Sequence, residues 1–252
     1  RLAVFFYAGQ VNALELMRMQ ARTLYEVDEQ QRLRRVPDLT APQTEWEQAP
    51  RFFLGRTPAG NIWHIRHDLS SDLMNELDAL GRTEPPLQAG SEPSLAAQVR
   101  ALLGGGEEWR SPAYLLPAQA GIGQTGTGQT GTGQTVAITP KTAHLLLPNF
   151  PGTAERAHKD QNGPFTSVIE HGQAVAVCSS VRQSGTAAEA GVFTLEGWRG
   201  QGYAAQVTAL WANLVRAQGR LPLYSTSWEN TASQAVAHRL NGQWFGEDWS
   251  IK

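Results

Sequence analysis

The residues of this sequence best suited to chemistry are an arginine and two glycines at alternate positions. Arg199 is followed by Gly200 and Gly202, and an apolar pattern of helical spacing begins at Tyr203. A pyrophosphate needs several backbone N–H groups pointing at it with no side chains in the way, which a glycine-rich turn entering a helix N-terminus provides. A guanidinium adds a positive charge beside the phosphates. Residues Arg199 to Ala204 therefore predict a pyrophosphate-binding loop, and the alternative is a tight strand-to-helix turn without a ligand.

The elements around this loop fit that geometry. Alternating and continuous apolar patterns predict strands before it, and apolar residues at helical spacing predict helices after it. The expected elements are strands over residues 165–170, 173–181 and 188–195, a helix over 203–218, a strand over 221–227, a helix over 230–240 and an extended segment over 249–251. This order of strands and helices indicates a layered α/β domain.

The region before residue 121 is predicted to be α+β. Its expected elements are a helix over 10–36, strands over 51–55 and 61–66, a helix over 71–80 with Gly81 as its C-cap, and a helix over 92–103. We expect three parts in the chain: this N-terminal region over 1–120, a low-complexity Gly/Gln/Thr loop over 121–135, and an α/β domain over 136–252 that carries the phosphate loop.

The low-complexity segment contains a pattern that is easily mistaken for a nucleotide site. Gly121, Gly123 and Gly126 match the dinucleotide-binding pattern G-x-G-x-x-G. That pattern indicates a site only when it follows a strand and opens a helix, and no apolar helix follows here. We therefore interpret the segment as a mobile loop or insertion, because its composition cannot bury a core.

At the phosphate loop the sequence resembles the GNAT superfamily of N-acetyltransferases. Arg199-x-x-Gly202-x-Ala204 matches the Q/R-x-x-G-x-G/A signature of that superfamily, and the stretch from Gly191 is similar to its fourth strand. Leu223 onward is similar to its fifth strand and next helix. The resemblance implies an α/β fold with a GNAT-like mixed sheet and helices on both faces. The N-terminal region is then an acceptor-binding region or a degenerate GNAT-like half. The Tyr224-Ser-Thr stretch and the extra N-terminal region also resemble the zwittermicin-acetyltransferase-like branch of the superfamily.

The resemblance also implies a set of residues that bind acetyl-CoA. The fourth strand would pair with the pantetheine arm, and one of its N–H groups would hold the thioester oxygen, a contribution of about 3 kcal/mol. The implied cofactor-binding residues are Phe193, Thr194, Leu195, Arg199, Gly200, Gln201, Gly202, Tyr203, Ala204, Asn230 and Ser233. Asn230 has an alternative interpretation as a helix N-cap, and both interpretations are compatible.

The candidate general base is Glu189, which strand alternation places on the same face as Phe193. A carboxylate in an apolar strand is costly unless it is paired or functional. The alternative is that Glu189 lies at the exposed end of the strand and pairs with Arg182. Many members of the superfamily have a tyrosine acid where this chain has Ala237. Either another residue such as Tyr224 or Ser225 serves, or the thiolate leaves without an acid; we take Tyr224 as the candidate.

Composition limits the partners of this chain. Its net charge of −2 gives no attraction to nucleic acid or to an anionic membrane, and it contains one cysteine, Cys178, which we expect to be a small core residue. His64 and His67 would point to opposite faces of a strand, so no metal site is expected. We expect a cytoplasmic monomer or homodimer that transfers an acetyl group from acetyl-CoA to a primary amine of a small molecule. The alternative is an acyl-CoA-binding protein of GNAT fold without transferase activity.

Overall fold

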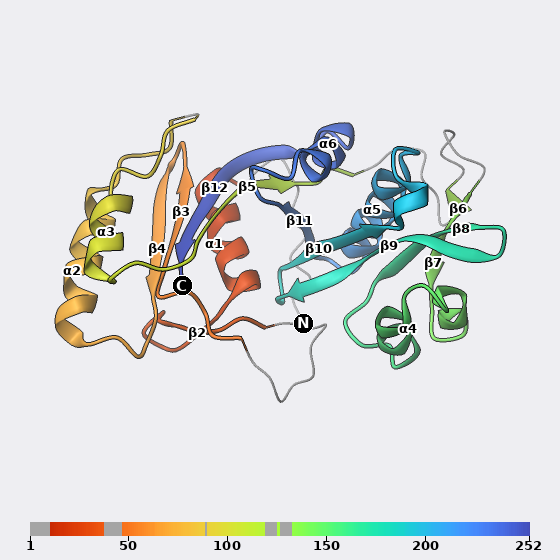
Figure 1. Cartoon of the computed structure of the whole chain (residues 1–252), viewed down its shortest axis with the longest axis horizontal. Helices are drawn as coiled ribbons and strands as arrows, with labels where there is room; N and C mark the ends of the chain where they lie inside the picture. Colours follow the sequence, from red (N-terminus) through yellow and green to blue (C-terminus); the bar gives the residue numbers. More distant parts are fainter. Residues whose placement is uncertain (1–10, 38–46, 89, 119–124, 127–132) are drawn as a thin grey trace.

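A mixed sheet of ten strands runs through the chain in this computed structural model (Figure 1). The structure describes residues 11–37, 47–88, 90–118, 125–126 and 133–252. The strand order is β4-β3-β12-β5-β11-β10-β9-β8-β7-β6. The strands are β3 (Phe52–Thr57), β4 (Gly60–Ile65), β5 (Glu108–Leu115), β6 (Thr125–Gly126), β7 (Gln134–Ile138), β8 (Phe165–Glu170), β9 (Gln173–Gln183), β10 (Ala187–Thr194), β11 (Leu221–Ser225) and β12 (Gln243–Ile251). A separate antiparallel pair consists of β1 (Glu26–Val27) and β2 (Leu33–Arg35).

Helices cover both faces of this sheet. They are α1 (Ala13–Leu24), α2 (Ser71–Thr83), α3 (Ala96–Leu102), α4 (Pro151–His158), α5 (Tyr203–Ala217) and α6 (Thr231–Arg239), with the 3-10 turns η1 (Ala143–Leu146) and η2 (Glu196–Trp198). On β10, Ala188 and Ala190 pack in the core cluster that includes α5, whereas Ala187 packs in the cluster that includes α1. Successive side chains of a strand point to opposite faces, so α1 and α5 lie on opposite faces. The predicted fold class is therefore confirmed, and the N-terminal region is α+β as predicted.

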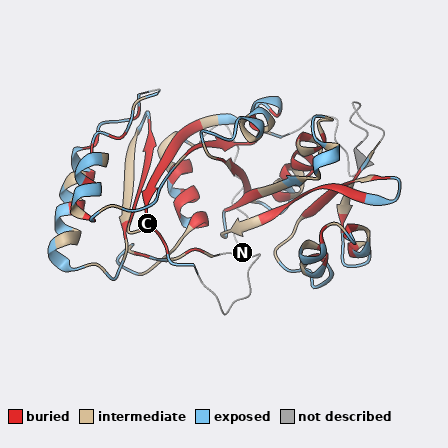
Figure 2. Ribbon diagram, in the orientation of Figure 1, coloured by how far each residue is buried: buried red, intermediate tan, exposed pale blue. Residues whose placement is uncertain are grey.

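The depth of burial differs between the helices. In Figure 2 the strands and α1 are mostly buried, whereas α2 and α3 expose much of their surface. Only Leu77 and Gly81 of α2 are buried, while α5 buries most of its residues. The core that supports the predicted phosphate loop is therefore the layer between α5 and strands β8 to β11.

The strands β10 and β11 separate after a short stretch of pairing. They are the one parallel pair of the large sheet among the described residues, and their register covers only Ala187 to Glu189 against Leu221 to Leu223. β10 continues to Thr194 while still paired with β9, and β11 continues to Ser225 while paired with β5. Beyond Glu189 the facing edges of β10 and β11 are thus unpaired, which opens a gap inside the sheet.

The last strand of the chain lies among strands of the N-terminal region. β12 pairs antiparallel with β3 on one side and with β5 on the other, and β5 in turn pairs with β11. Figure 1 shows this as the dark blue β12 beside the orange β3. The sheet therefore joins the two predicted parts of the chain, and residues from both parts can meet near the gap.

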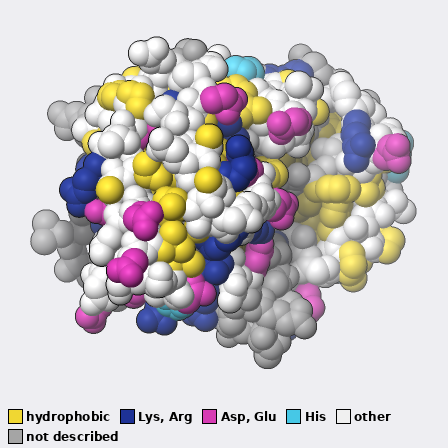
Figure 3. Space-filling model, turned by 60° about the vertical axis from the view of Figure 1, so that its left-hand side comes forward, with side chains coloured by type: hydrophobic (Ala, Val, Ile, Leu, Met, Phe, Trp, Pro, Cys, Tyr) yellow, Lys and Arg dark blue, Asp and Glu magenta, His cyan; other side chains and the backbone are white. Residues whose placement is uncertain are grey.

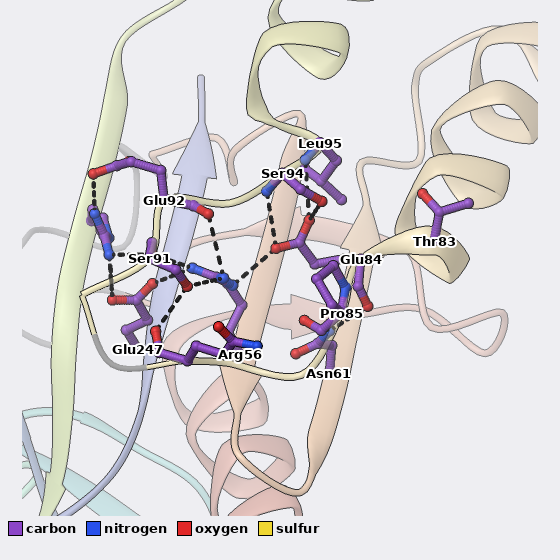
Figure 4. Close-up of polar contacts among 12 residues, drawn as sticks. Arg56, Asn61, Thr83, Glu84, Pro85, Ser91, Glu92, Ser94, Leu95 and Glu247 are labelled. Carbon is purple, nitrogen blue, oxygen red and sulfur yellow. Dashed lines mark hydrogen bonds and ion pairs between the residues drawn. The ribbon is translucent and has the colours of Figure 1, made fainter.

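A buried ionic network holds β12 in that position (Figure 4). Arg56 of β3 binds Glu247 of β12 at 2.7 Å and Glu84 at 3.0 Å, and all three side chains are at most 1% exposed. Arg110 of β5 binds the other oxygen of Glu247 at 2.9 Å. Glu84 also accepts hydrogen bonds from the residues before α3. Because Glu247 is tied to both neighbouring strands, the network fixes the position of the next residue, Asp248, on the opposite face.

Several predicted elements have different boundaries in the structure. The helix predicted over 10–36 ends at Leu24, because Tyr25 is extended (φ −137°) and the chain continues into β1, a turn with a positive φ at Gln31, and β2. Gly81 lies inside α2 and is not its C-cap; a Cβ there would lie 2.6 Å from the ring of Trp63, so the glycine allows close packing. The helix predicted from residue 92 begins later, at Ala96.

The remaining predicted strands and helices are present, and their ends differ from the predicted ones by one to several residues. β3 and β4 form the predicted N-terminal hairpin, and β8, β9, β10, α5, β11 and α6 follow in the predicted order. β12 is longer than the extended segment predicted at its end. Most of the low-complexity segment lies outside the described residues, as does most of the G-x-G-x-x-G match. Its described residues are not all loop, since Thr125 and Gly126 form the short strand β6, which pairs with β7, and β7 begins within the segment at Gln134.

Candidate functional site

The predicted phosphate loop enters α5 in the conformation that its glycines allow. Gly200 and Gly202 both have φ of 79°, a region that other residues enter only with strain. Gly202 is the N-cap of α5 and has no side chain to bond the first N–H groups of the helix. Tyr203 is 1% exposed and its hydroxyl donates to Glu170 of β8, so its side chain anchors the helix start and only its backbone can face a ligand.

A cavity of about 580 Å³ opens in front of this loop. Its walls come from β10, the loop, the first turn of α5, β11 and one side of α6. The predicted residues that line it are Phe193, Thr194, Arg199, Gly200, Gly202, Tyr203, Ala204, Tyr224, Asn230 and Ser233. Two predicted cofactor-binding residues, Leu195 and Gln201, are not among the residues that line it. The cavity therefore brings together most of the residues that the resemblance implied.

The backbone of β10 contributes polar groups to the gap. The N–H of Leu195 donates to Val175 of β9 at 2.9 Å, so it is not available to a ligand, in contrast to the prediction for this residue. N–H groups alternate in direction along an antiparallel strand, so those of Val192 and Thr194 point to the unpaired edge. The hydroxyl of Thr194 is buried there without a hydrogen-bond partner among the described residues. Val192 lines the cavity and is a site residue that the sequence reasoning missed.

The opposite wall of the cavity is formed by β11 and the start of α6. The side chain of Asn230 accepts from the N–H of Ser233 at 3.0 Å, so the N-cap interpretation is confirmed, and Asn230 also lines the cavity. The hydroxyl of Ser233 hydrogen-bonds that of Tyr224 at 2.6 Å. Burial raises the pKa of Tyr224 to about 12. Ala237 is fully buried in the core, so this position offers no acid.

Arg239 is a second residue that the sequence reasoning missed. It lies at the C-terminal end of α6 and lines the cavity together with Ala232, Ala235 and Val236. These residues share one stripe of the helix, spaced three and four apart, that starts from the N-cap Asn230. That spacing was visible in the sequence and could have found Arg239 as a second cation for an anionic ligand, beside Arg199.

Glu189 lies on the other face of the sheet, at the point where β10 and β11 separate. It is 3% exposed, and its Oε1 accepts from both the N–H and the hydroxyl of Ser225 at 2.7 Å. Its Oε2 is buried without a partner among the described residues. Burial raises the pKa of Glu189, only partly offset by the Ser225 hydrogen bonds and by Arg182. The alternative of an exposed, Arg182-paired carboxylate is wrong, because Glu189 is buried and no ion pair joins these two described residues.

A second cavity of about 310 Å³ lies beside Glu189. Its walls come from α1, β5, β9, β10, β11 and β12, so both parts of the chain contribute. Asp248 of β12 lines it and accepts from Gln20 at 2.7 Å and from Ser111 at 2.8 Å. Burial, together with the nearby negative charge of Glu189, raises the pKa of Asp248 to about 7. No sequence signal pointed to Asp248, because its place here depends on β12 crossing to the N-terminal strands.

The two cavities lie on either side of the point where β10 and β11 separate, and no residue lines both. On β11, Tyr224 faces the α5 side and the first cavity, whereas Ser225 holds Glu189 at the second. On β10, Val192 packs towards the α5 side and Glu189 is on the side of Ala187 and α1. The glycine loop therefore lies at one cavity and the buried carboxylate of Glu189 at the other.

Other candidate features carry no chemistry in this structure. Cys178 is fully buried in the core cluster, as predicted, and burial raises the pKa of its thiol. Among the described residues, no group of three potential metal-ligating side chains comes together. No helix in the described part of the chain is long and apolar enough to span a membrane. The face drawn in Figure 3 has acidic and basic side chains interspersed rather than a patch of one sign.

Comparison with known proteins finds similarity in structure only. No family model matches the chain, and no curated protein matches it. The similar solved structures include a GCN5-related N-acetyltransferase-like protein from Streptococcus suis, at 15% identity and a TM-score of 0.47, covering 81% of this chain and 85% of that chain. They also include a protein of the GNAT family from Novosphingobium aromaticivorans, at 17% identity and a TM-score of 0.40, covering 57% of this chain and 64% of that chain.

A further similar structure is a tandem GNAT protein from the clavulanic acid biosynthesis pathway. It has 13% identity and a TM-score of 0.44, with 75% of this chain and 73% of that chain covered. The chain spans just under two thirds of the length of the Novosphingobium protein, which is 64% covered. Similarity at these identities does not extend to function, which rests on the geometry of the site.

Proposed function

We propose that this chain is an N-acetyltransferase of the GNAT type, which transfers an acetyl group from acetyl-CoA to a primary amine of a small molecule. The observation that carries the proposal is the gap between β10 and β11, which has a glycine loop on one face and the buried Glu189 on the other. An extended thioester ligand in this gap would have its phosphates at the loop and its reactive carbon near the carboxylate.

The residues of the first cavity fit acetyl-CoA in three respects. The positive-φ glycines leave the first N–H groups of α5 uncapped, which suits a pyrophosphate. Arg199 and Arg239 add positive charge at the same cavity. The unpaired edge of β10 offers the polar groups of Val192 and Thr194 to the amides of the pantetheine arm, as a neighbouring strand would.

The residues around the gap would divide the reaction between them. Glu189 takes one proton from the acceptor ammonium, and burial raises its pKa, which makes it a stronger base than an exposed carboxylate. The free amine attacks the thioester carbon, and a backbone N–H of β10 holds the oxyanion. The new C–N bond forms, the C–S bond breaks, and one of the two remaining amine protons is released as the amide forms, while the other stays on the amide nitrogen. CoA leaves as a thiolate and takes up one proton.

Tyr224 acts on the leaving thiolate as a hydrogen-bond donor. Its pKa of about 12 is some three units above the typical thiol value of about 8.5. Full proton transfer to the thiolate would therefore be uphill by about 5 kcal/mol. A hydrogen bond needs no such transfer, so Tyr224 would stabilise the charge, and the thiolate would take its proton from water.

The direct test is a thermal-shift titration of the wild-type chain with acetyl-CoA, with NAD and ATP as controls. A ligand at 100 times its dissociation constant stabilises the folded state by about 2.7 kcal/mol. Stabilisation by acetyl-CoA alone supports the proposal, and stabilisation by none of the three contradicts it. Acetyl-CoA binding without transfer to any amine would favour the alternative, a binding protein of the same fold.

A further inference from the structure

The cavity beside Glu189 is lined by two charged side chains of opposite sign, each with one polar atom that makes no hydrogen bond. Oε2 of Glu189 and Nε of Arg182 are both buried without a hydrogen-bond partner among the described residues. Both residues line the cavity of about 310 Å³. Glu189 is buried and Arg182 is half-buried. A buried polar group without a partner is costly, so each is an expected contact for a ligand of the opposite charge.

These two side chains start from neighbouring positions but do not bind each other. Glu189 and Arg182 are directly aligned cross-strand partners of β10 and β9, a position in which opposite charges usually pair. Instead the Glu189 carboxylate is turned towards β11, where Ser225 donates to it twice at 2.7 Å. A positive and a negative group are thereby held apart at one cavity.

The other charged groups of the cavity are already paired. Asp248 accepts from Gln20 and Ser111, and Lys252 forms an ion pair with Glu47 at the exposed side. The unused capacity is therefore one cation, Arg182, and one carboxylate oxygen, that of Glu189. A ligand that complements both must carry a positive and a negative group a short distance apart.

We propose that the acceptor is a free amino acid or a similarly small amino-carboxylate, with Arg182 binding its carboxylate and Glu189 its ammonium group. This inference rests on the proposed function. The cavity volume is at the lower end of the roughly 300–1,000 Å³ usual for small-molecule sites, which favours a small acceptor. A carboxylate suits the site better than a phosphate, because a second negative charge would lie close to Glu189 and Asp248.

In this assignment Arg182 is a positioning residue. It does not touch the reacting atoms, but it fixes the carboxylate of the acceptor and so presents the amine to Glu189. The transfer itself is unchanged: the amine gains the acetyl group, loses one proton to Glu189 and a second on amide formation, and CoA leaves as a thiolate that is then protonated. Loss of Arg182 should therefore raise KM far more than it lowers kcat.

The test compares the proteinogenic L-amino acids with their C-terminal amides as acceptors in a thiol-release assay with acetyl-CoA. For the wild type, at least one free amino acid should have a KM about 10- to 100-fold below that of its amide, since an ionic hydrogen bond to the carboxylate is lost in the amide. R182Q should raise KM for the free acid by the same factor, leave KM for the amide unchanged, and so remove the preference. R182K should restore part of it.

Controls separate this inference from the proposed function. R34Q changes an exposed arginine that lines no cavity and should leave both KM values unchanged. R182Q should retain the thermal shift with acetyl-CoA, which shows that it folds. If acetyl-CoA binds but amides serve as well as free acids, or neither is acetylated, the amino-carboxylate inference is overturned. If acetyl-CoA gives no thermal shift to the wild type, the proposed function itself fails.

Discussion

The two cavities at the gap between β10 and β11 are built in different ways. The first is made largely of backbone and small residues that are close in sequence, in the loop from Arg199 to Ala204 and in α6. The second combines charged side chains and hydroxyls with apolar residues, from six elements that are far apart in sequence. The first cavity is therefore shaped by local conformation, which a short motif can specify, and the second by tertiary placement, which no motif records.

The largest expected effect is on turnover, from a variant in the second cavity that should leave acetyl-CoA binding at the first cavity intact. E189Q should lower kcat by about 100- to 10,000-fold, because it removes the general base. It should leave the acetyl-CoA dissociation constant within about twofold, since the amide oxygen can still accept from Ser225. Steady-state kinetics and calorimetry measure the two quantities. E196Q, in the exposed turn η2, is the matched control and should change neither.

The network that holds β12 should matter more to stability than any exposed ion pair. R56M leaves Glu84 and Glu247 buried without their cation and should lower the free energy of unfolding by about 3–5 kcal/mol in urea titrations. R82M breaks an exposed pair with Asp78, whose side chains are 68% and 35% exposed, and should cost at most about 1 kcal/mol. Equal losses for the two variants would refute the structural role given to the network.

The raised pKa of Asp248, at the second cavity, predicts that the free energy of unfolding depends on pH. Its pKa is about 7 in the folded chain and about 3.9 unfolded, so the folded state favours the protonated form. Its contribution to stability is therefore fully present below pH 4 and is lost as pH rises through 7, by at most about 4 kcal/mol. D248N should reduce this slope when the free energy of unfolding is measured at pH 5, 6, 7 and 8. A slope as steep as the wild type's would contradict the assignment.

The smallest expected effect tests the backbone of the first cavity. G202A places a Cβ at φ of 79°, which costs about 1–2 kcal/mol and should weaken acetyl-CoA binding roughly 10-fold. G197A is the matched control: Gly197 has no positive φ and open space around a Cβ. It should bind acetyl-CoA as the wild type does. Calorimetric titration of both variants measures the difference, and equal affinities would show that the loop conformation does not set the binding.

The same contrast explains how much could be predicted from the sequence. The glycine loop, α5 and the Asn230 cap were predictable because each depends on neighbouring residues and on local backbone conformation. Strand alternation placed Glu189 and Phe193 on one face, but in the structure Phe193 lines the first cavity and Glu189 the second. Asp248 was not predictable, because nothing near residue 248 records that β12 lies between β3 and β5.

Two further sequence predictions differ from the structure for local reasons. The helical spacing of apolar residues predicted a helix to residue 36. The backbone instead becomes extended at Tyr25 and forms the small β1–β2 sheet. The backbone of Leu195 was expected to pair with the ligand, but its N–H donates to Val175. Which edge of β10 a given N–H faces depends on the register with β9, which the sequence does not reveal.

The central claim is that acetyl-CoA occupies the unpaired edge of β10 beside the glycine loop. Residue-resolved hydrogen exchange, with and without acetyl-CoA, tests it most directly. We predict that the ligand slows exchange of the amides of Val192 and Thr194 and of the first residues of α5, while the already bonded Leu195 amide changes little. Unchanged exchange at Val192 and Thr194 under saturating acetyl-CoA would contradict the account.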